Sequence, residues 1–139
     1  MSAQVFSHRH RVTYAECTVG NHVYYSRYLD LLESARGEFF RSLGYTFLEL
    51  QQRDLIFPVI SCQVQYRAPA RYDDNLKIEV WLMELGRIKL CFGYRIHNEA
   101  GTLILEASTV HVCTSLHEKP KRLAAEISHA LQSQLRAAL

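Results

Sequence analysis

The sequence predicts one α+β domain in which an antiparallel sheet packs against a long apolar helix. Three observations lead to this fold class. The 139 residues are enough for a single domain, 1–139, and too few for two. Apolar residues recur at helical spacing between residues 27 and 43, and they alternate with polar residues in four runs after residue 55.

The chain opens with a strand pattern from Phe6 to Tyr14, where apolar and polar side chains alternate. A turn-like segment, Ala15 to Tyr25, follows and has Gly20 near its middle. This segment leads directly into the helical pattern, so it is expected to fix how the helix begins.

The predicted helix runs from Arg27 to Leu43, with Ser26 as its N-cap and Gly44 just beyond its C-terminus. Its apolar stripe is broad and rich in aromatic residues, namely Tyr28, Leu31, Leu32, Ala35, Phe39, Phe40 and Leu43. A stripe of this width predicts a well-buried helix.

Four long strands are expected next, after a short polar connection over 51–54. They are Leu55–Arg67, Asn75–Leu85, Ile88–His97 and Thr102–Ser115. Short turns between consecutive strands favour an antiparallel meander. A second amphipathic helix, Lys121–Leu139, closes the order β–α–β–β–β–β–α. One sheet packed on one helix leaves exposed edges, so we expect self-association as a homodimer or homotetramer.

Composition and charge argue against some binding partners and cellular locations. Sixteen Lys and Arg against fourteen Asp and Glu give a formal charge of +2, which argues against non-specific nucleic-acid binding. No apolar run reaches the roughly 20 residues of a membrane span, and the N-terminus has no signal-peptide pattern. The four cysteines form no C-x-x-C pair, which favours free, buried thiols in a reducing cytoplasm.

Two segments resemble signatures of a known family. The stretch from Thr18 to Arg36 contains a Gly/His turn, an aromatic pair, a Tyr at the helix start and Glu-x-Ala-Arg on the helix. The stretch from Tyr66 to Leu76 contains Tyr-x-x-Pro and an acidic turn. In register and in this element order, they resemble the hot-dog-fold acyl-CoA thioesterases of the 4-hydroxybenzoyl-CoA thioesterase type.

The resemblance implies a five-stranded antiparallel sheet wrapped on one long helix, plus a C-terminal helix. It implies hydrolysis of an acyl-CoA or acyl-carrier thioester without a cofactor. It also implies a dimer joined edge to edge, with active sites at the subunit interface. The thioester carbonyl would lie at the start of the long helix, where free amides stabilise an oxyanion. Val23, Tyr24 and Tyr25 are the expected substrate-binding residues there, with the backbone N–H groups near Val23 to Ser26 as donors. The rings of Tyr24 and Tyr25 either line the acyl pocket or pack in the core.

The sequence departs from the family at Thr18, where the catalytic Asp usually stands. A threonine hydroxyl is not a base near neutral pH. Three replacements remain open. Glu16 lies two residues earlier, and Glu33 lies on the helix, where an ion pair with Arg36 is the alternative. In the third, similar to enediyne polyketide thioesterases, Thr18 and Arg36 orient a water without a carboxylate.

Other polar residues have weaker expected roles. His22 in the turn either donates to the thioester or holds the turn. His8 and His10 share a strand face, but no third ligand is evident, so no metal site is expected. Four cations are candidates for CoA phosphate contacts, namely Arg67, Arg71, Arg87 and Lys89.

The leading hypothesis is therefore an acyl-CoA thioesterase. The alternatives are a carrier-linked polyketide-type thioesterase that lacks the acidic residue, and a non-catalytic dimer that binds acyl thioesters.

Overall fold

The computed structural model describes residues 5–136 and consists of one sheet, one small hairpin and three α-helices. The strands are β1 (Phe6–Arg11), β2 (Cys17–Thr18), β3 (His22–Val23), β4 (Val59–Tyr66), β5 (Asn75–Leu85), β6 (Lys89–His97) and β7 (Leu103–Val112). The helices are η1 (Tyr14–Glu16, 3₁₀), α1 (Arg27–Ser42), α2 (Phe47–Gln52) and α3 (Ala125–Gln132). Within residues 5–136, the helices are all too short or too polar to cross a lipid bilayer.

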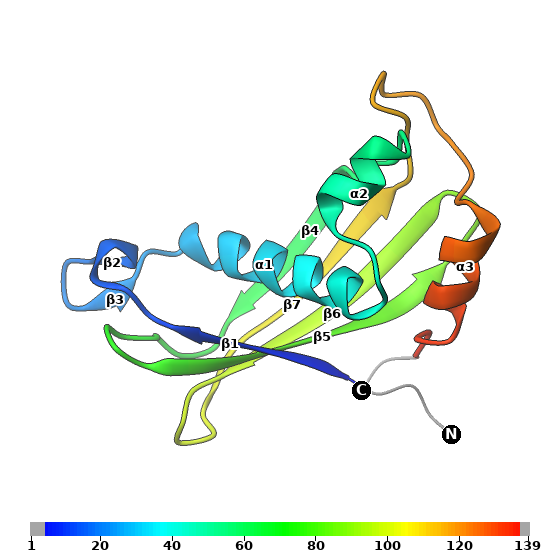
Figure 1. The fold of residues 1–139 in the computed structure, drawn as a ribbon. Coiled ribbons are helices and arrows are strands. Elements are labelled where there is room, and N and C mark those ends of the chain that lie inside the picture. The colour runs from blue at the N-terminus through cyan, green and yellow to red at the C-terminus, as the bar shows by residue number, and fades with distance from the viewer. Residues whose placement is uncertain (1–4, 137–139) are drawn as a thin grey trace.

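The main sheet has five antiparallel strands in the order β1-β5-β6-β7-β4, with α1 lying across one face (Figure 1). This is the hot-dog arrangement that the resemblance implies. The predicted four-strand meander is wrong in one respect, because β4 pairs with β7 and not with β5. The connection over 67–74 leaves the sheet to pass the start of α1, where Val23 N donates to Ala70 O at 2.9 Å. The strand before this connection therefore becomes the far edge of the sheet.

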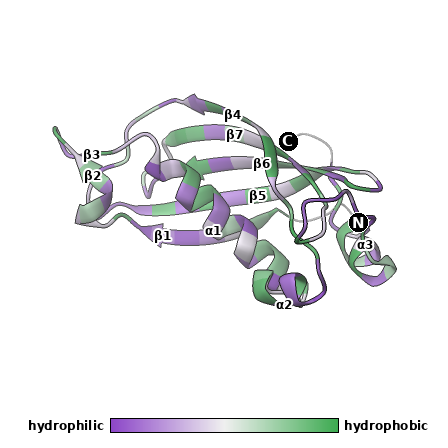
Figure 2. Ribbon diagram, turned by 90° about the horizontal axis from the view of Figure 1, so that it is seen from above, coloured by the Kyte–Doolittle hydropathy of each residue, from purple (hydrophilic) through white to green (hydrophobic). Residues whose placement is uncertain are grey.

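Helix α1 confirms the predicted helix within one residue at its C-terminus. Its buried side chains face the inward side chains of β5 and β6, and seen from above it runs obliquely over the strands (Figure 2). Phe39 and Phe40 are at most 1 % exposed and contact Phe92 edge-on. Burial of each such ring contributes about 2–3 kcal/mol, so packing under α1 dominates the core.

Edge strand β4 differs from the other long strands because almost none of its side chains is buried. Val59, Ile60 and Tyr66 are 48 %, 59 % and 49 % exposed. An exposed apolar edge strand is a template for pairing with another strand. The expectation of self-association therefore centres on β4.

Several boundaries differ from the predictions. Strand β4 begins at Val59, where the sequence predicted Leu55, and β7 ends at Val112, where it predicted Ser115. Strand β1 ends at Arg11, because residues 14–16 form the 3₁₀ turn η1. Helix α2 was not predicted, although Thr46 and Glu49 form a capping box that marks its start. Helix α3 covers Ala125–Gln132 only, and residues 137–139 of the predicted C-terminal helix lie outside the described residues.

All four cysteines are free, as predicted. Cys91 and Cys113 are buried, whereas Cys62 is exposed on β4, so the expectation of buried thiols holds for only part of the set.

Candidate functional site

A tight hairpin holds the chain just before α1. Strands β2 and β3 pair Cys17 with Val23 and Thr18 with His22. Gly20 closes the turn between them with φ 84°, a conformation that glycine adopts without a steric penalty. The hairpin fixes the direction in which the chain enters the helix.

The backbone amides at this entrance divide into two groups. The amide of Val23 donates to Ala70 O and that of Tyr24 to Glu16 O, both at 2.9 Å. Within residues 5–136, the amides of Tyr25 and Ser26 have no acceptor. Ser26 is the N-cap, as predicted, but its side chain makes no capping hydrogen bond. The start of α1 thus presents free donors at the positive end of the helix dipole.

A tyrosine-lined hollow of about 350 Å³ lies beside these donors. Its walls come from the hairpin, from α1 and from the end of β4, and they are His22, Val23, Tyr25, Tyr28, Tyr66, Arg67, Ala68 and Pro69. Tyr66 Oη donates to Tyr25 O at 3.0 Å, and Ala70 N donates to Tyr28 Oη at 3.1 Å. These two bonds tie the end of β4 and the following connection to α1. We call this space the entrance hollow.

Four of the predicted site residues line the entrance hollow, namely His22, Val23, Tyr25 and Arg67. Tyr28 and Tyr66 also line it and were not predicted as site residues, although each stands inside one of the quoted family segments. Their positions at the helix start and at the strand end could have identified them as site residues from the sequence alone.

Thr18 is exposed and lies on the neighbouring strand of the hairpin, β2. It lines a separate hollow of about 550 Å³ with Tyr14, Cys17, Val19, Gly20, Asn21 and Tyr72. Its direct cross-strand partner is His22, and side chains in such a pair have Cβ atoms roughly 5 Å apart. Thr18 is therefore next to the entrance hollow but does not line it.

The carboxylate of Glu16 has structural partners. Its Oε1 lies 2.8 Å from His10 Nε2 and accepts from Thr13 N at 2.7 Å. Burial opposes ionisation, but the hydrogen bonds from Thr13 and His10 outweigh it and hold the pKa of Glu16 below its ordinary value. A carboxylate with a low pKa and occupied oxygens is a poor base.

Glu33 and Arg36 lie further along α1, at a second cavity of about 430 Å³ that we call the acyl cavity. Its remaining lining is mostly apolar, namely Phe47, Leu50, Gln51, Leu55, Ile56, Phe57 and Pro58. Arg36 is 7 % exposed, and its Nη2 lies 3.8 Å from Glu33 Oε2. The side chain of Glu33 is 71 % exposed, so this ion pair is weak.

The acyl cavity and the entrance hollow share no lining residue. Arg36 lies nine positions after Arg27, which corresponds to about 13.5 Å along the helix. Within one copy of the chain, Thr18 and Arg36 therefore do not surround one water molecule, as the third catalytic arrangement requires.

Arg36 begins a chain of buried hydrogen bonds that sequence reasoning missed. Arg36 Nη1 donates to Tyr94 Oη at 3.0 Å, Tyr94 Oη lies 2.7 Å from Thr109 Oγ1, and Thr109 Oγ1 lies 2.8 Å from His111 Nε2. His111 Nδ1 lies 2.9 Å from Phe57 O. The available signal was the polar residues Thr109 and His111 on the otherwise apolar inward face of β7.

The four candidate cations do not form one cluster. Arg67 bonds to Glu106 at 3.0 Å, and Arg71 Nη1 donates to Gly20 O at 3.5 Å, both near the hairpin. Arg87 lies in the β5–β6 turn at the opposite end of β5, and Lys89, the first residue of β6, pairs with Glu84. A strand of 11 residues spans about 36 Å, too far for one group of phosphate contacts.

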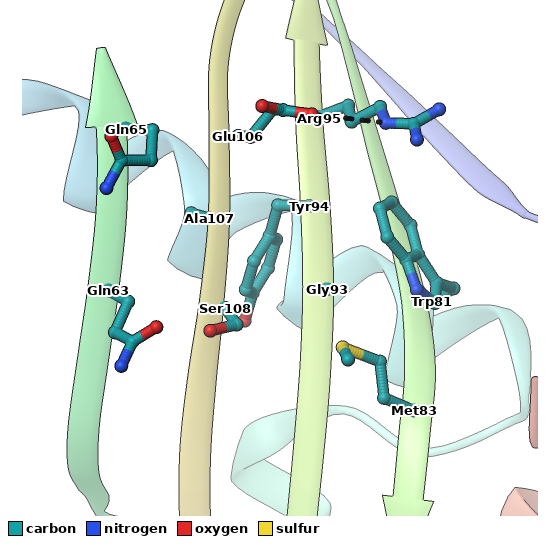
Figure 3. Close-up of a pocket in the computed structure, with 10 residues that line it drawn as sticks. All are labelled: Gln63, Gln65, Trp81, Met83, Gly93, Tyr94, Arg95, Glu106, Ala107 and Ser108. Atoms are coloured by element: carbon teal, nitrogen blue, oxygen red, sulfur yellow. Dashed lines mark ion pairs between the residues drawn. The ribbon is translucent and has the colours of Figure 1, made fainter. Parts of the chain in front are cut away.

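The opposite face of the sheet has a hollow of about 270 Å³ that contains none of the predicted residues. Figure 3 shows Trp81 beside Gly93, with Arg95 and Glu106 paired across neighbouring strands. A Cβ at Gly93 would lie 2.5 Å from the Trp81 ring, so the indole requires glycine there.

In the part of the chain that the structure describes, no three His, Cys, Asp or Glu side chains converge on a possible metal ion.

Comparisons with known proteins agree with this geometry. The profile of the thioesterase-like superfamily matches residues 12–135. The acyl-CoA thioester hydrolase YbgC of Escherichia coli is 34 % identical over 124 residues, covering 88 % of this chain and 92 % of that protein. The putative acyl-CoA thioesterase YneP of Bacillus subtilis is 28 % identical over 102 residues, covering 73 % and 74 %.

Among solved structures, a hypothetical protein from Thermus thermophilus superposes with a TM-score of 0.88 at 33 % identity. The match covers 92 % of this chain and 98 % of that one. The likeness to this structure therefore extends over almost the whole length of both chains.

Proposed function

The chain belongs to the thioesterase-like superfamily and is an acyl-CoA thioester hydrolase, and we propose that the reaction takes place in the entrance hollow at the start of α1. The free amides of Tyr25 and Ser26 are the observation that carries this proposal. A tetrahedral intermediate places negative charge on the former carbonyl oxygen, and preorganised amide donors stabilise it. One such donor contributes about 3 kcal/mol to transition-state stabilisation.

His22 is the proposed general base. It is the only imidazole or carboxylate group that lines the entrance hollow among the described residues. Glu16 is bound to His10 and Thr13, and Glu33 lines a different cavity. A histidine accepts a proton from water near neutral pH, and Thr18, its cross-strand neighbour, is positioned to orient that water.

A homodimer joined through β4 completes the proposed site. Two copies of an edge strand related by a two-fold axis pair antiparallel. Tyr66, at one end of β4, touches the entrance hollow, whereas Pro58, just before its other end, touches the acyl cavity. Antiparallel pairing would therefore bring the entrance hollow of one protomer opposite the acyl cavity of its partner.

The proposal also covers the residues that contact the CoA phosphates, the cellular compartment and the carrier of the acyl group. Arg67 and Arg71, next to the hairpin, are the cations that suit the CoA phosphates, although Arg67 already binds Glu106. The free cysteines fit a reducing cytoplasm. An acyl group on a carrier protein is an alternative substrate, since the hairpin and α1 would present the same donors to its thioester.

Hydrolysis of a panel of acyl-CoAs, followed by release of free thiol, tests the function. We expect thiol release above the uncatalysed rate for at least one chain length or aryl group. Binding of the substrates by calorimetry without thiol release would instead support the non-catalytic acyl-binding dimer.

A further inference from the structure

We propose that the acyl cavity selects acyl groups that carry a second, terminal carboxylate, and that Arg36 is the residue that recognises it. This inference rests on the proposed thioesterase function and adds the class of acyl group. The first observation is the unusual state of Arg36. Its guanidinium has five N–H donors, yet within residues 5–136 it makes one hydrogen bond, to the neutral hydroxyl of Tyr94.

Burial makes this state costly without an anion. Arg36 is 7 % exposed, and its closest carboxylate oxygen, on Glu33, is 3.8 Å away, beyond hydrogen-bond distance. Buried charges in proteins are normally paired. The other titratable groups around it are Cys62, Tyr94 and His111, and burial raises the pKa of the first two, which keeps them uncharged at neutral pH.

The hydrogen-bond chain behind Arg36 has a single direction. Phe57 O can only accept, so His111 Nδ1 carries the proton. Burial lowers the pKa of His111 to about 4, so the ring is neutral and its Nε2 accepts from Thr109. Thr109 in turn accepts from Tyr94, and the Tyr94 oxygen is left to accept from Arg36.

This direction fixes the guanidinium without neutralising it. Tyr94 holds Nη1 of Arg36. Arg36 lines the acyl cavity, and within residues 5–136 its remaining N–H groups have no hydrogen-bond acceptor. A planar guanidinium binds a carboxylate through two parallel hydrogen bonds. The walls of the cavity are mostly apolar, which suits the methylene chain between the thioester and such a carboxylate.

Matched substrates test the proposal directly. Hexanoyl-CoA and adipoyl-CoA, and octanoyl-CoA and suberoyl-CoA, differ within each pair only in a terminal methyl or carboxylate. We expect wild-type kcat/KM to favour a carboxylated member by about tenfold or more, because charge-assisted hydrogen bonds are the strong ones. Turnover of the methyl members without any preference for a carboxylated one would overturn this inference and leave the thioesterase function intact. Absence of turnover of all four would count against the proposed function itself.

Variants locate the preference. Arg36→Met is expected to lower the carboxylate-to-methyl ratio of kcat/KM by about 10- to 100-fold. Arg41→Met is the matched control, since Arg41 lies on the same helix, is 63 % exposed and pairs with Glu38. Tyr94→Phe tests the positioning role of Tyr94, and we expect it to lower the same ratio by a few-fold. An unchanged ratio in Arg36→Met would contradict the proposal.

Equilibrium binding provides a readout without turnover. The probe is the thioether of CoA that carries a five-carbon chain with a terminal carboxylate, and its binding is measured by calorimetry against the pentyl thioether. Glu33→Gln should tighten binding of the carboxylate probe about two- to fivefold, because it removes the negative charge that competes for Arg36. Since Glu33 is exposed, this variant serves even if Arg36→Met fails to fold. Unchanged or weaker binding of the carboxylate probe to Glu33→Gln would overturn the proposal.

Discussion

The start and the middle of α1 carry two different kinds of chemistry. At the start, the polar groups are backbone amides beside exposed tyrosines, and the hollow opens next to an unpaired sheet edge. In the middle, a buried arginine is held by a chain of side chains that reaches from α1 to β7. We infer from this difference that backbone amides stabilise the reacting atoms, whereas side chains determine which acyl group binds.

The sharpest test of the start of α1 compares two variants that both lose the same aromatic side chain, of which only one also loses the backbone N–H group. Tyr25 is the second residue of a turn in which Arg27 N donates to Tyr24 O at 2.8 Å, a position that accepts proline. Tyr25→Pro and Tyr25→Ala both lose the ring, but only the first loses the N–H group. We expect kcat of Tyr25→Pro to be about 100-fold below that of Tyr25→Ala, as for loss of one oxyanion donor. Equal kcat values would remove this amide from the mechanism.

The identity of the base gives the next largest effect. His22→Gln should lower kcat by roughly 100-fold, the usual contribution of a general base. Glu16→Gln is the comparison, because it replaces the carboxylate shared by His10 and Thr13 with a neutral amide that keeps one acceptor oxygen, and it is expected to reduce the free energy of unfolding by about 1 kcal/mol. A full loss of activity in Glu33→Gln, with His22→Gln active, would instead assign the base to Glu33 of the partner subunit.

The proposed pairing through β4 would link the two regions, and a charged side chain on that strand tests it. Ile60→Lys should weaken the dimer at least tenfold, and specific activity should then fall on dilution, because the proposed site needs both protomers. Analytical ultracentrifugation and activity at matched concentrations measure both effects. Leu48→Lys, at an equally exposed position on α2, is the control and should remain dimeric.

The last prediction concerns the pH dependence of stability, to which the middle of α1 contributes through His111. The folded pKa of His111 is about 4, below the ordinary value of 6.5. Between these values the unfolded chain binds the proton and the folded chain does not, so stability is full above about pH 6.5 and falls as the pH drops toward 4. The loss is roughly 3 kcal/mol. Urea unfolding at pH 7 and pH 4.5 should show a smaller difference in His111→Gln than in wild type, and equal differences would contradict this assignment.

The fold was largely predictable because its signals are local. The helix from Arg27 and strand Asn75–Leu85 follow from side-chain periodicity, and the structure has them at the predicted starts. The position of β4 at the far edge was not predictable, because it depends on how the connection over 67–74 passes α1 and not on the pattern of the strand itself.

The site was predictable only in part, for a related reason. The start of α1 was identified from the residues between Thr18 and Arg36, whereas the amides that are free depend on which carbonyls the tertiary structure brings near Val23 and Tyr24. The hydrogen-bond partner of Arg36, Tyr94, lies 58 positions away in the chain. A single sequence carries no signal for such contacts beyond polar residues on an apolar strand face.

A crystal structure with a non-hydrolysable acyl-CoA analogue tests the central claim most directly. We predict that the oxygen in place of the thioester carbonyl lies within about 3.1 Å of the Tyr25 or Ser26 amide nitrogen. An analogue bound with that oxygen away from the start of α1 would contradict the account.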